Sequence, residues 1–535
     1  MKKSKFMTAL LAAAFFTISA FAANPDKDIV ILYTNDVHCG IDDDIGYAGL
    51  SLYKEEMKET TPYVTLVDAG DAIQGGTIGM LSKGGYIISL MNQLNYDIAV
   101  PGNHEFDYGM DRFLELSKKL NCGYLSSNFT GKNGKFLFPA YKIISYGNTK
   151  VAYIGVTTPE SLTSSNPANF LDKKGKLLYD FGGDKLFELT QKAVDDARKN
   201  GADYVIVVAH LGEKCNLAEF SAMNLIANTN GIDALIDGHS HEVTPKLLAK
   251  NKDGKEIPIT QSGTKLKYIG KVVLSKDGNI YTDLVAEVPQ KNGATKDEKI
   301  EASINQIKSD LAATLEKKYG ESSFDMNALD ENNKWYVRSS ERNIANFLTD
   351  AFRTVMKTDI AIINGGGIRA NLKAGDITFN DILTVQPFNN KLYAYQISGQ
   401  TILDELEFGV RKLPEMFGGI MHTAGLTYKV NTGIPSSVVV NEKGFFTGEV
   451  KGEYRVHDVL VNGQPLDLNK TYTVASISFF VMNHGDGHLF KDAKIIGSKS
   501  PMTDYEAVCE YLNILKGKVP EDYQKPEGQG RLIIE

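Results

Sequence analysis

The sequence is poor in cysteine, and it has neither a repeated segment nor a second long hydrophobic run. Its four cysteines, at positions 39, 122, 215 and 509, are spread over 535 residues, which is not the spacing of a disulfide framework. One bridge is possible, but the sequence does not select a pair. After the first two dozen residues no segment approaches the ~18 apolar residues of a membrane span. With 42% hydrophobic residues and no solenoid or propeller repeat, we expect a large globular protein.

The first 22 residues have the pattern of a secretory signal peptide. Three lysines within Met1–Lys5 precede an apolar stretch from Phe6 to Ala22, which ends in the small-residue pattern Ala20-Phe21-Ala22. The alternative is an uncleaved membrane anchor. The cleavage position carries no cysteine, so a lipid-anchored form is not expected. We predict that the mature chain is exported, to the periplasm or the medium, and is not bound to a membrane.

The charge balance limits the partners of the mature chain. Without the three lysines of the leader, the 58 basic residues become 55 against 66 acidic ones, a net charge of −11. A surface of this sign argues against polymeric nucleic acid as a partner. It does not exclude small anions as ligands. Charges farther away than about 8–10 Å are screened, so a local cluster of cations determines whether an anion binds.

Short runs of β-branched residues alternate with helical segments in the first half of the chain. These runs are near-continuously apolar, which is typical of strands covered on both faces, and we therefore predict an α/β fold. The expected strands are 29–32, 63–67, 98–100, 151–154, 204–208 and 232–236, and two more are expected at 360–363 and 471–475.

A single amphipathic helix is predicted over Thr295–Tyr319. Isoleucine and leucine recur there at intervals of three and four residues, and Gly320 is expected to end the helix. We place a linker helix at 295–320, between a first domain at 28–290 and a second α/β or α+β domain at 335–535.

Polar side chains follow five of the predicted strands, at the position where each strand ends. They are Asp36, His38, Asp71, Asn103, His210, His239 and His241. Functional groups of α/β sheets gather beyond the carboxyl ends of strands, and residues i and i+2 of an extended chain point to one side. A lone histidine in a loop is more simply a hydrogen-bonded residue, but this convergence predicts a metal site. Aspartate, histidine and asparagine suit borderline divalent ions better than calcium.

These residues lie in motifs that resemble those of calcineurin-like metallophosphoesterases, specifically the secreted 5′-nucleotidase family. The motifs are Tyr33–His38, Gly70-Asp71, Gly102–Asp107, His210–Gly212 and Asp237–His241, and the match runs in order through essentially the whole mature chain. The resemblance implies a four-layer α/β/β/α N-terminal sandwich and two divalent metal ions, of zinc, manganese, iron or cobalt.

The resemblance also assigns roles to individual residues. Asp36, His38, Asp71 and His241 would hold one ion, while Asp71, Asn103, His210 and His239 would hold the other, so that Asp71 bridges them. His104 and Asp107 would form a catalytic pair. Two such cations clamp a phosphate and activate a bound water, and His104 would stabilise charge that builds on the phosphoryl oxygens.

The second half carries residues suited to a nucleotide. In Asn364-Gly365-Gly366-Gly367-Ile368-Arg369, the glycines allow close approach of a ligand and the arginine offers a planar fork for phosphate. A tight structural turn is the alternative interpretation. Taken alone, Phe388 and the Phe479-Phe480 pair would be core aromatics beside turns.

The family resemblance gives these residues ligand-binding roles. Phe388 and Phe480 would sandwich the base, Asp486 would bind the ribose hydroxyls, and Asn364 and Gly366 would contact the base. Arg338 and Arg369 would reach the phosphate. Lys334 stands where some members carry another arginine. Stacking tolerates any base, so broad base acceptance is expected.

We therefore predict an enzyme that hydrolyses nucleoside 5′-monophosphates, and also di- or triphosphates or nucleotide-sugars, as a monomer or homodimer. One alternative is a 2′,3′-cyclic-nucleotide 2′-phosphodiesterase with 3′-nucleotidase activity, although such enzymes tend to carry tyrosines in place of Phe388 and Phe480. A thiosulfohydrolase shares the fold but has no use for a base sandwich. A binding or metal-storage protein that has lost catalysis is opposed by the complete set of ligands.

Overall fold

The computed structural model describes residues 24–131, 133–172, 176–215, 217–291, 293–496 and 502–535. The predicted signal peptide lies outside the described residues. Within them, no helix has the length and apolar character needed to cross a bilayer, and all four cysteines are free thiols.

The N-terminal part contains two sheets that face each other. The first has five strands in the spatial order β11 (Ile280–Val285), β10 (Ile269–Leu274), β1 (Ile29–Thr34), β2 (Val64–Asp68) and β3 (Ile98–Ala99). Strands β1, β2 and β3 run parallel, whereas β10 and β11 are antiparallel additions at one edge. The parallel strands therefore deliver their carboxyl ends to one edge of the sheet.

The second sheet repeats this arrangement with a parallel centre. Its order is β4 (Tyr141–Tyr146), β5 (Thr149–Thr157), β6 (Tyr204–His210), β7 (Ala234–Ile236), β9 (Glu256–Ser262) and β8 (Val243–Lys250). Strands β5, β6, β7 and β9 run parallel to one another, and β4 and β8 are antiparallel edges.

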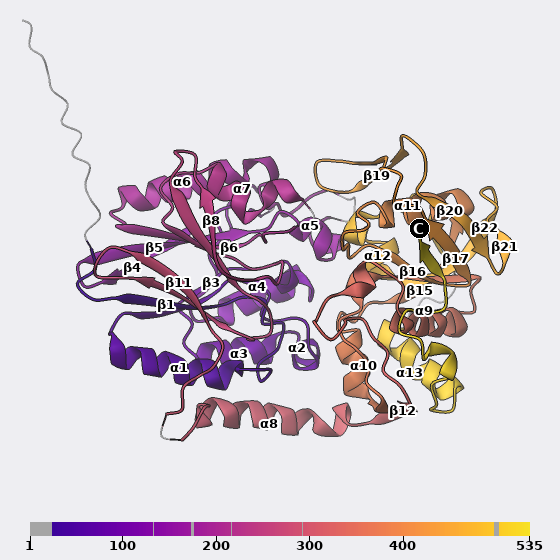
Figure 1. The fold of residues 1–535 in the computed structure, drawn as a ribbon, viewed down its shortest axis with the longest axis horizontal. Helices are drawn as coiled ribbons and strands as arrows, with labels where there is room; N and C mark the ends of the chain where they lie inside the picture. Colours follow the sequence, from indigo (N-terminus) through magenta and orange to yellow (C-terminus); the bar gives the residue numbers. More distant parts are fainter. Residues whose placement is uncertain (1–23, 132, 173–175, 216, 292, 497–501) are drawn as a thin grey trace, which may run out of the picture.

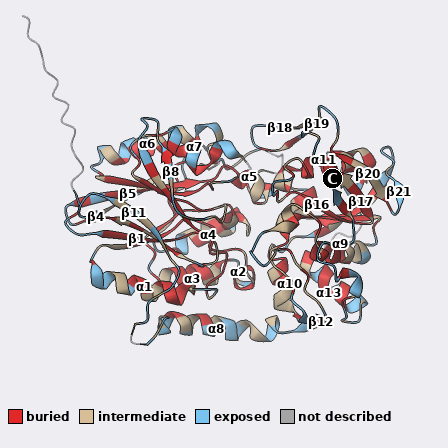
Figure 2. Ribbon diagram, viewed as in Figure 1, coloured by how far each residue is buried: buried red, intermediate tan, exposed pale blue. Residues whose placement is uncertain are grey.

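Alternating side chains of the strands build three hydrophobic cores. On β1, Ile29, Ile31 and Tyr33 pack between the two sheets, together with Val151 and Ile206 of the second sheet. The opposite faces pack against helices, so the central strands of both sheets are buried on both faces (Figure 2). The predicted α/β/β/α sandwich is confirmed.

The helices of the N-terminal part lie on the two outer faces (Figure 1). Helices α1 (Gly46–Thr60), α3 (Gly85–Gln93) and α4 (Met110–Lys119) contribute to the core on the first sheet, and α6 (Leu186–Lys199) and α7 (Ala222–Ala227) to the core on the second. The short helices α2 (Thr77–Ser82) and α5 (Ser161–Ser164) lie toward the C-terminal part.

Helix α8 (Glu298–Leu315) connects the two parts and is shorter than predicted. The Asp297 side chain caps it by accepting hydrogen bonds from the backbone N–H groups of Lys299 and Ile300. Ile300 and Ile304 are buried in the core beside α1 and α3. The helix ends at Leu315 rather than Tyr319, because residues 318–322 form strand β12 and pair with β14.

The C-terminal part is a mixed α/β unit. Its main sheet has the order β16 (Met421–Ala424), β13 (Ile360–Asn364), β22 (Thr471–Ile477), β15 (Leu392–Ser398) and β23 (Lys494–Ile496). Only β13 and β22 are parallel, so the segments after these two strands leave the sheet at the same edge. Both strands were predicted.

Smaller sheets and helices complete this part. The other strands are β12 (Lys318–Ser322), β14 (Gly375–Thr378), β17 (Leu426–Val430), β18 (Val438–Val440), β19 (Phe446–Val450), β20 (Val456–Val461), β21 (Gln464–Pro465) and β24 (Leu532–Ile534). The helices are α9 (Asn343–Met356), α10 (Phe379–Val385), α11 (Gly399–Gly409), α12 (Ser478–Val481) and α13 (Asp504–Ile514).

Candidate active site

The predicted metal ligands meet at the carboxyl edge of the N-terminal sheets. Five of the seven have left-handed backbone, with φ of 50° at Asp36, 45° at His38, 59° at Asp71, 80° at His239 and 61° at His241. Such conformations are uncommon outside glycine and cluster at functional sites. The loops are tied together by backbone hydrogen bonds from Asp36 to Gly70 and from His38 to Asp71, each 2.9 Å long.

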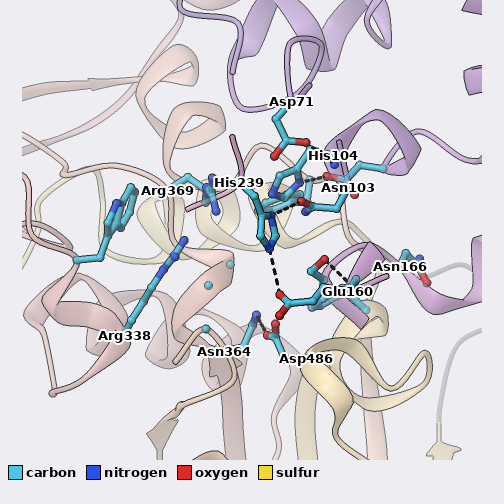
Figure 3. Close-up of a pocket in the computed structure, with 18 of the residues that line it drawn as sticks. Asp71, Asn103, His104, Glu160, Asn166, His239, Arg338, Asn364, Arg369 and Asp486 are labelled. Carbon is cyan, nitrogen blue, oxygen red and sulfur yellow. Dashed lines mark hydrogen bonds and ion pairs between the residues drawn. The ribbon is translucent and has the colours of Figure 1, made fainter. Parts of the chain in front are cut away.

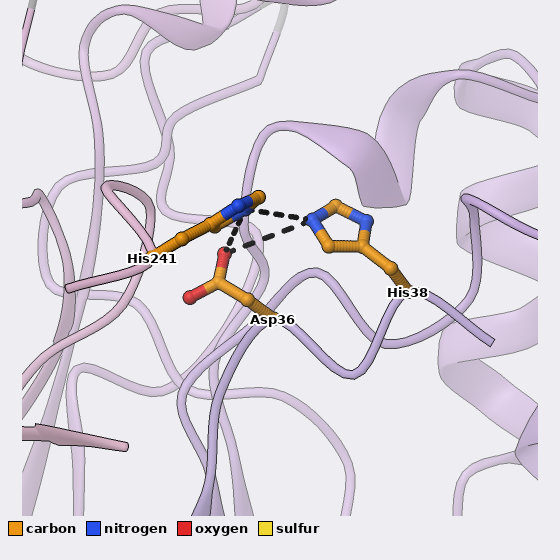
Figure 4. A group of neighbouring side chains, drawn as sticks. All are labelled: Asp36, His38 and His241. Atoms are coloured by element: carbon orange, nitrogen blue, oxygen red, sulfur yellow. Dashed lines mark hydrogen bonds and ion pairs between the residues drawn. The ribbon is translucent and has the colours of Figure 1, made fainter. Parts of the chain in front are cut away.

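The first ligand group consists of Asp36, His38 and His241, whose ligand atoms all lie within 4.8 Å of one another (Figure 4). His38 Nε2 lies 3.0 Å from His241 Nε2, and Asp36 Oδ1 lies 3.4 Å from His241 Nε2. Burial lowers the pKa of both histidines. Both imidazoles are therefore neutral near pH 7, which is the form that binds a metal.

The second ligand group consists of Asp71, His210 and His239. His210 Nε2 lies 3.1 Å from Asp71 Oδ2, and His239 Nδ1 lies 2.9 Å from the amide oxygen of Asn103. His210 Nδ1 donates to the backbone oxygen of Ala69, so its Nε2 points into the site. Among the described residues this buried Nε2 makes no well-directed hydrogen bond, and Asp71 Oδ2 is the oxygen beside it, as in two ligands of one metal.

Asp71 lies between the two groups. Its Oδ2 is 3.8 Å from His38 Nε2 and 3.1 Å from His210 Nε2. Burial would raise the pKa of Asp71, but the charges of His210 and His104 hold that pKa well below its usual value. The carboxylate is therefore ionised and faces both groups. Converging nitrogen and oxygen donors of this kind fit two borderline divalent cations.

Glu105 holds the two central loops in place. This fully buried carboxylate accepts hydrogen bonds from the backbone N–H groups of Asp71 at 2.8 Å, Ala72 at 2.8 Å and Gly102 at 2.6 Å. A Cβ added at Gly102 would lie 2.3 Å from Asp71 Oδ1, so the close approach of these loops requires glycine there.

The predicted pair His104 and Asp107 is formed at the floor of the same site. His104 Nδ1 lies 2.6 Å from Asp107 Oδ2, and Ser165 Oγ donates to Asp107 Oδ1 at 2.8 Å. A carboxylate on Nδ1 fixes the ring orientation and leaves Nε2 to act on a ligand. The backbone N–H of His104 also donates to Asp71 Oδ1.

Two arginines approach this site from the C-terminal part (Figure 3). The guanidinium groups of Arg338 and Arg369 lie 5.0 Å and 5.6 Å from the ring centroid of Trp335. Burial and the neighbouring Arg369 lower the pKa of Arg338 to about 9, so both side chains are cationic near pH 7. Among the described residues Arg338 Nε has no hydrogen-bond partner. Two adjacent cations of this kind form an anion site.

The glycine-rich segment and the Gly-Asp-Gly segment lie side by side. They follow β13 and β22, whose parallel pairing brings them to one edge. Asn364 Nδ2 donates to Asp486 Oδ2 at 2.6 Å, and the backbone N–H of Gly366 donates to Gly418 at 2.7 Å. Burial raises the pKa of Asp486.

The structure corrects the predicted aromatic pair. Phe388 lines the cavity, with its ring 5.8 Å from that of His104 and 5.7 Å from the Arg369 guanidinium. Phe480 does not line it: this ring is 0% exposed and packs against His488 and Phe490. Its neighbour Phe479 is half-buried and lines the cavity. The prediction for Phe480 was therefore wrong, because the short helix α12 turns position 480 into the core.

Glu160 is a site residue that the sequence analysis missed. It is 1% exposed, and its Oε2 lies 3.0 Å from His239 Nε2 (Figure 3). Its other oxygen accepts from the backbone N–H of Leu217. Metal-binding histidines commonly donate their second nitrogen to a carboxylate, and Glu160 has this relation to His239. Its only sequence signal is its position three residues after β5.

A cavity of about 1110 Å³ lies between the two parts of the chain, and each ligand group contributes to its lining, the first through His241 and the second through Asp71 and His239. The metal-ligand groups and His104 lie on one wall, and Arg338, Arg369, Phe388, Phe479 and Asp486 lie on the other. This volume exceeds what a single mononucleotide needs, since ordinary ligand sites span roughly 300–1,000 Å³. The arrangement can hold an anion against two cations while an attached aromatic group stacks opposite.

Comparisons with known proteins match both parts of the chain. Residues 29–243 match the calcineurin-like phosphoesterase family, and residues 319–493 match the 5′-nucleotidase C-terminal domain. The sequence is 27% identical to a snake venom 5′-nucleotidase from Gloydius brevicauda, over 98% of this chain and 92% of the relative. It is 28% identical to a trifunctional nucleotide phosphoesterase from Bacillus subtilis, over 95% of this chain and 35% of the relative.

A solved structure has the same overall arrangement. The crystal structure of a 5′-nucleotidase precursor from Thermus thermophilus superposes with a TM-score of 0.78 at 25% sequence identity. The match covers 95% of this chain and 99% of that one.

Proposed function

Because this chain belongs to the 5′-nucleotidase family, with a calcineurin-like phosphoesterase domain followed by a 5′-nucleotidase C-terminal domain, we propose that it hydrolyses phosphate esters of nucleotides. Nucleoside 5′-monophosphates are the proposed main substrates, and di- or triphosphates and nucleotide-sugars are further ones. The observation that carries this proposal is the single cavity with metal ligands on one wall and two arginines, two aromatic rings and Asp486 on the other.

Two divalent cations would be held by the two ligand groups, with Asp71 shared and Asn103 completing the second. When bound, such a pair neutralises the phosphate and supplies a nucleophile from water near neutral pH. The donor set fits zinc, manganese, iron or cobalt and does not select among them. The Nε2 of His210, which is buried and points into the site, supports this assignment.

His104 would stabilise the phosphoryl group as its charge changes. Asp107 holds the imidazole through Nδ1, so Nε2 is available to donate a hydrogen bond to a phosphoryl oxygen. Arg338 and Arg369 would bind the same phosphate from the opposite wall, where both guanidinium groups lie beside the Trp335 ring. The chain thus holds the phosphate between residues from both parts.

The nucleoside would occupy the C-terminal wall. Phe388 and Phe479 would stack on the base, with Phe479 taking the place of Phe480, which the sequence analysis had assigned to this role. Asp486 would accept from the ribose hydroxyls, held in position by Asn364. Base stacking is worth roughly 1–3 kcal/mol and does not depend on base identity, so we propose broad acceptance of bases.

The chain is proposed to act outside the cytoplasm, on the evidence of the lysine-rich and apolar leader at residues 1–22. We propose cleavage after this leader and release to the periplasm or the medium, as a monomer or homodimer. We also propose the domain limits 28–290, 295–320 and 335–535.

Phosphate release from AMP, UDP-glucose and 2′,3′-cyclic AMP tests this function. AMP is expected to be hydrolysed, and Asp71→Asn should reduce the rate by more than the roughly 10–100-fold that loss of an outer partner of a metal ligand costs. The exposed Asp253 provides the matched control Asp253→Asn, which should leave the rate unchanged. A strong preference for the cyclic substrate would instead support the 2′,3′-cyclic-nucleotide phosphodiesterase. Full activity of Asp71→Asn would contradict the metal mechanism.

A further inference from the structure

His488 is a fully buried histidine whose two ring nitrogens both face hydrogen-bond acceptors. Its Nδ1 lies 2.8 Å from Glu405 Oε2 on helix α11, and its Nε2 lies 2.8 Å from the backbone oxygen of Gly419. A carbonyl oxygen only accepts, and an ionised carboxylate only accepts. Nε2 therefore donates to Gly419, and the proton of the second contact lies between Nδ1 and Glu405 Oε2.

Aromatic rings surround this histidine. Three phenylalanine rings enclose it, with centroid distances of 4.6 Å to Phe408, 4.4 Å to Phe480 and 5.6 Å to Phe490. They bury the contact between His488 and Glu405, where a hydrogen bond is stronger than in water. This enclosure also explains why Phe480 lies in the core: its ring is one wall of the His488 site.

The other carboxylate oxygen of Glu405 binds the backbone that directly follows His488. Its Oε1 accepts from the backbone N–H of Phe490 at 2.6 Å and from that of Leu489 at 3.1 Å. The carboxylate, itself 1% exposed, thus fixes residues 488–490 by their side chain and backbone together.

His488 connects the Gly418-Gly419 segment to the Gly485–Gly487 segment, and these two segments form one side of the nucleoside pocket. Asp486 precedes His488 by two residues, and a Cβ added at Gly418 would lie 3.4 Å from Asp486 Oδ1. One added at Gly419 would lie 3.0 Å from Asp486 Cβ. Asp486 has left-handed backbone, with φ of 55°, which it adopts only while its neighbours hold it.

We propose that charged His488, paired with Glu405, is a positioning residue that locks the Gly485–Gly487 segment against the Gly418-Gly419 segment and so sets Asp486 for the ribose. His488 touches no reacting atom: it is buried and does not line the cavity. It therefore determines affinity for the nucleoside moiety rather than the chemical step. This inference rests on the proposed nucleotide hydrolysis.

The test compares AMP with p-nitrophenyl phosphate, an ester that has no ribose. His488→Gln can donate only from its amide nitrogen and carries no charge, so it cannot replace both contacts. We expect its KM for AMP to rise about tenfold or more, equivalent to about 1.4 kcal/mol, while its kcat for AMP and both constants for p-nitrophenyl phosphate stay near those of the unaltered chain. Glu405→Gln should shift the same constant in the same direction.

The exposed His457, 38% exposed at its side chain, gives the matched control His457→Gln, which should change neither substrate. Equal losses on both substrates would show a general defect and overturn the positioning role, as would an unchanged KM for AMP. Failure of the nucleotidase proposal is distinct, because then the unaltered chain itself would not hydrolyse AMP.

A measurement on the unaltered chain does not depend on the folding of a variant. Nitrogen-15 NMR of histidine side chains should show His488 with both ring nitrogens protonated, assigned by loss of the signal in His488→Gln or by its change in Glu405→Gln. One protonated and one bare nitrogen would overturn the proposal, since the proton would then belong to Glu405.

Discussion

The neighbouring residues Phe479 and Phe480 should have separable functions, one in binding and one in stability. Phe479 lines the cavity, whereas Phe480 is 0% exposed. If Phe479 stacks on the base, Phe479→Ala should lose the roughly 1–3 kcal/mol of one stacked base, which corresponds to an increase in KM for AMP of roughly 5- to 150-fold. Its free energy of unfolding should change little.

Phe480→Ala should show the opposite pattern. Removing a fully buried phenylalanine ring costs roughly 3–5 kcal/mol of stability, and here the loss would also open the enclosure of His488. Where the folded protein persists, its KM for AMP should rise less than that of Phe479→Ala.

The assay pairs steady-state kinetics with urea unfolding of each variant. Phe388→Ala should resemble Phe479→Ala, and Phe136→Ala, at a ring that is 47% exposed, serves as the control that changes neither quantity. The reasoning is refuted if Phe480→Ala raises KM at unchanged stability while Phe479→Ala keeps the original KM.

Three further predictions concern Glu160 and Trp335 at the cavity and Asp504, which is buried at the start of α13. Glu160→Gln should weaken binding of zinc or manganese by roughly 10–100-fold in calorimetric titrations, because the His239 ring loses its anionic partner; an unchanged affinity, equal to that of the exposed control Glu219→Gln, would contradict this role. Trp335→Leu should raise KM for AMP by roughly 2- to 30-fold, since it removes the ring face shared by two arginines and worth about 0.5–2 kcal/mol. Trp335 is the only tryptophan, so the fluorescence of the unaltered chain should respond to nucleotide, and a silent titration would argue against its place in the site. Burial raises the pKa of Asp504 from 3.8 to about 7, so the folded state holds this proton to higher pH than the unfolded chain does. The stability that it contributes is present below about pH 4 and lost as pH rises through about 7. The asparagine of Asp504→Asn cannot ionise. Relative to the unaltered chain, the free energy of unfolding of this variant should therefore increase by up to a few kcal/mol between pH 4.5 and pH 8, as measured by urea unfolding. The same pH dependence in both chains would show that Asp504 ionises freely.

The metal-ligand groups could be predicted because their geometry follows from chain direction. Parallel strands β1, β2, β3, β6 and β7 bring their carboxyl ends together. The expected i, i+2 direction of an extended chain does not apply at Asp36 and His38 or at His239 and His241, because these residues have left-handed backbone. The convergence of these groups is present in the structure. Hydrophobic runs also located the eight predicted strands, because these are buried on both faces.

Features set by tertiary contacts could not be predicted. Strand β8 has only Ala249 buried among its eight residues, so it lacks the apolar run that marked the central strands. The end of α8 depends on pairing between β12 and the distant β14. Phe480 differs from Phe479 only in the direction of its side chain, and Glu160 lies outside the recognised motifs. In each case the deciding partner is remote in sequence.

The number of metal ions bound per chain distinguishes a dinuclear site from a mononuclear one, because the two ligand groups share one carboxylate. Chelated protein titrated with manganese or zinc should bind two ions per chain and regain hydrolysis of AMP, while Asp71→Asn should lose tight binding of both ions, since Asp71 Oδ2 faces His38 and His210 together. Binding of a single ion, two tight ions in Asp71→Asn, or full activity after chelation would contradict a dinuclear site at this edge of the sheets.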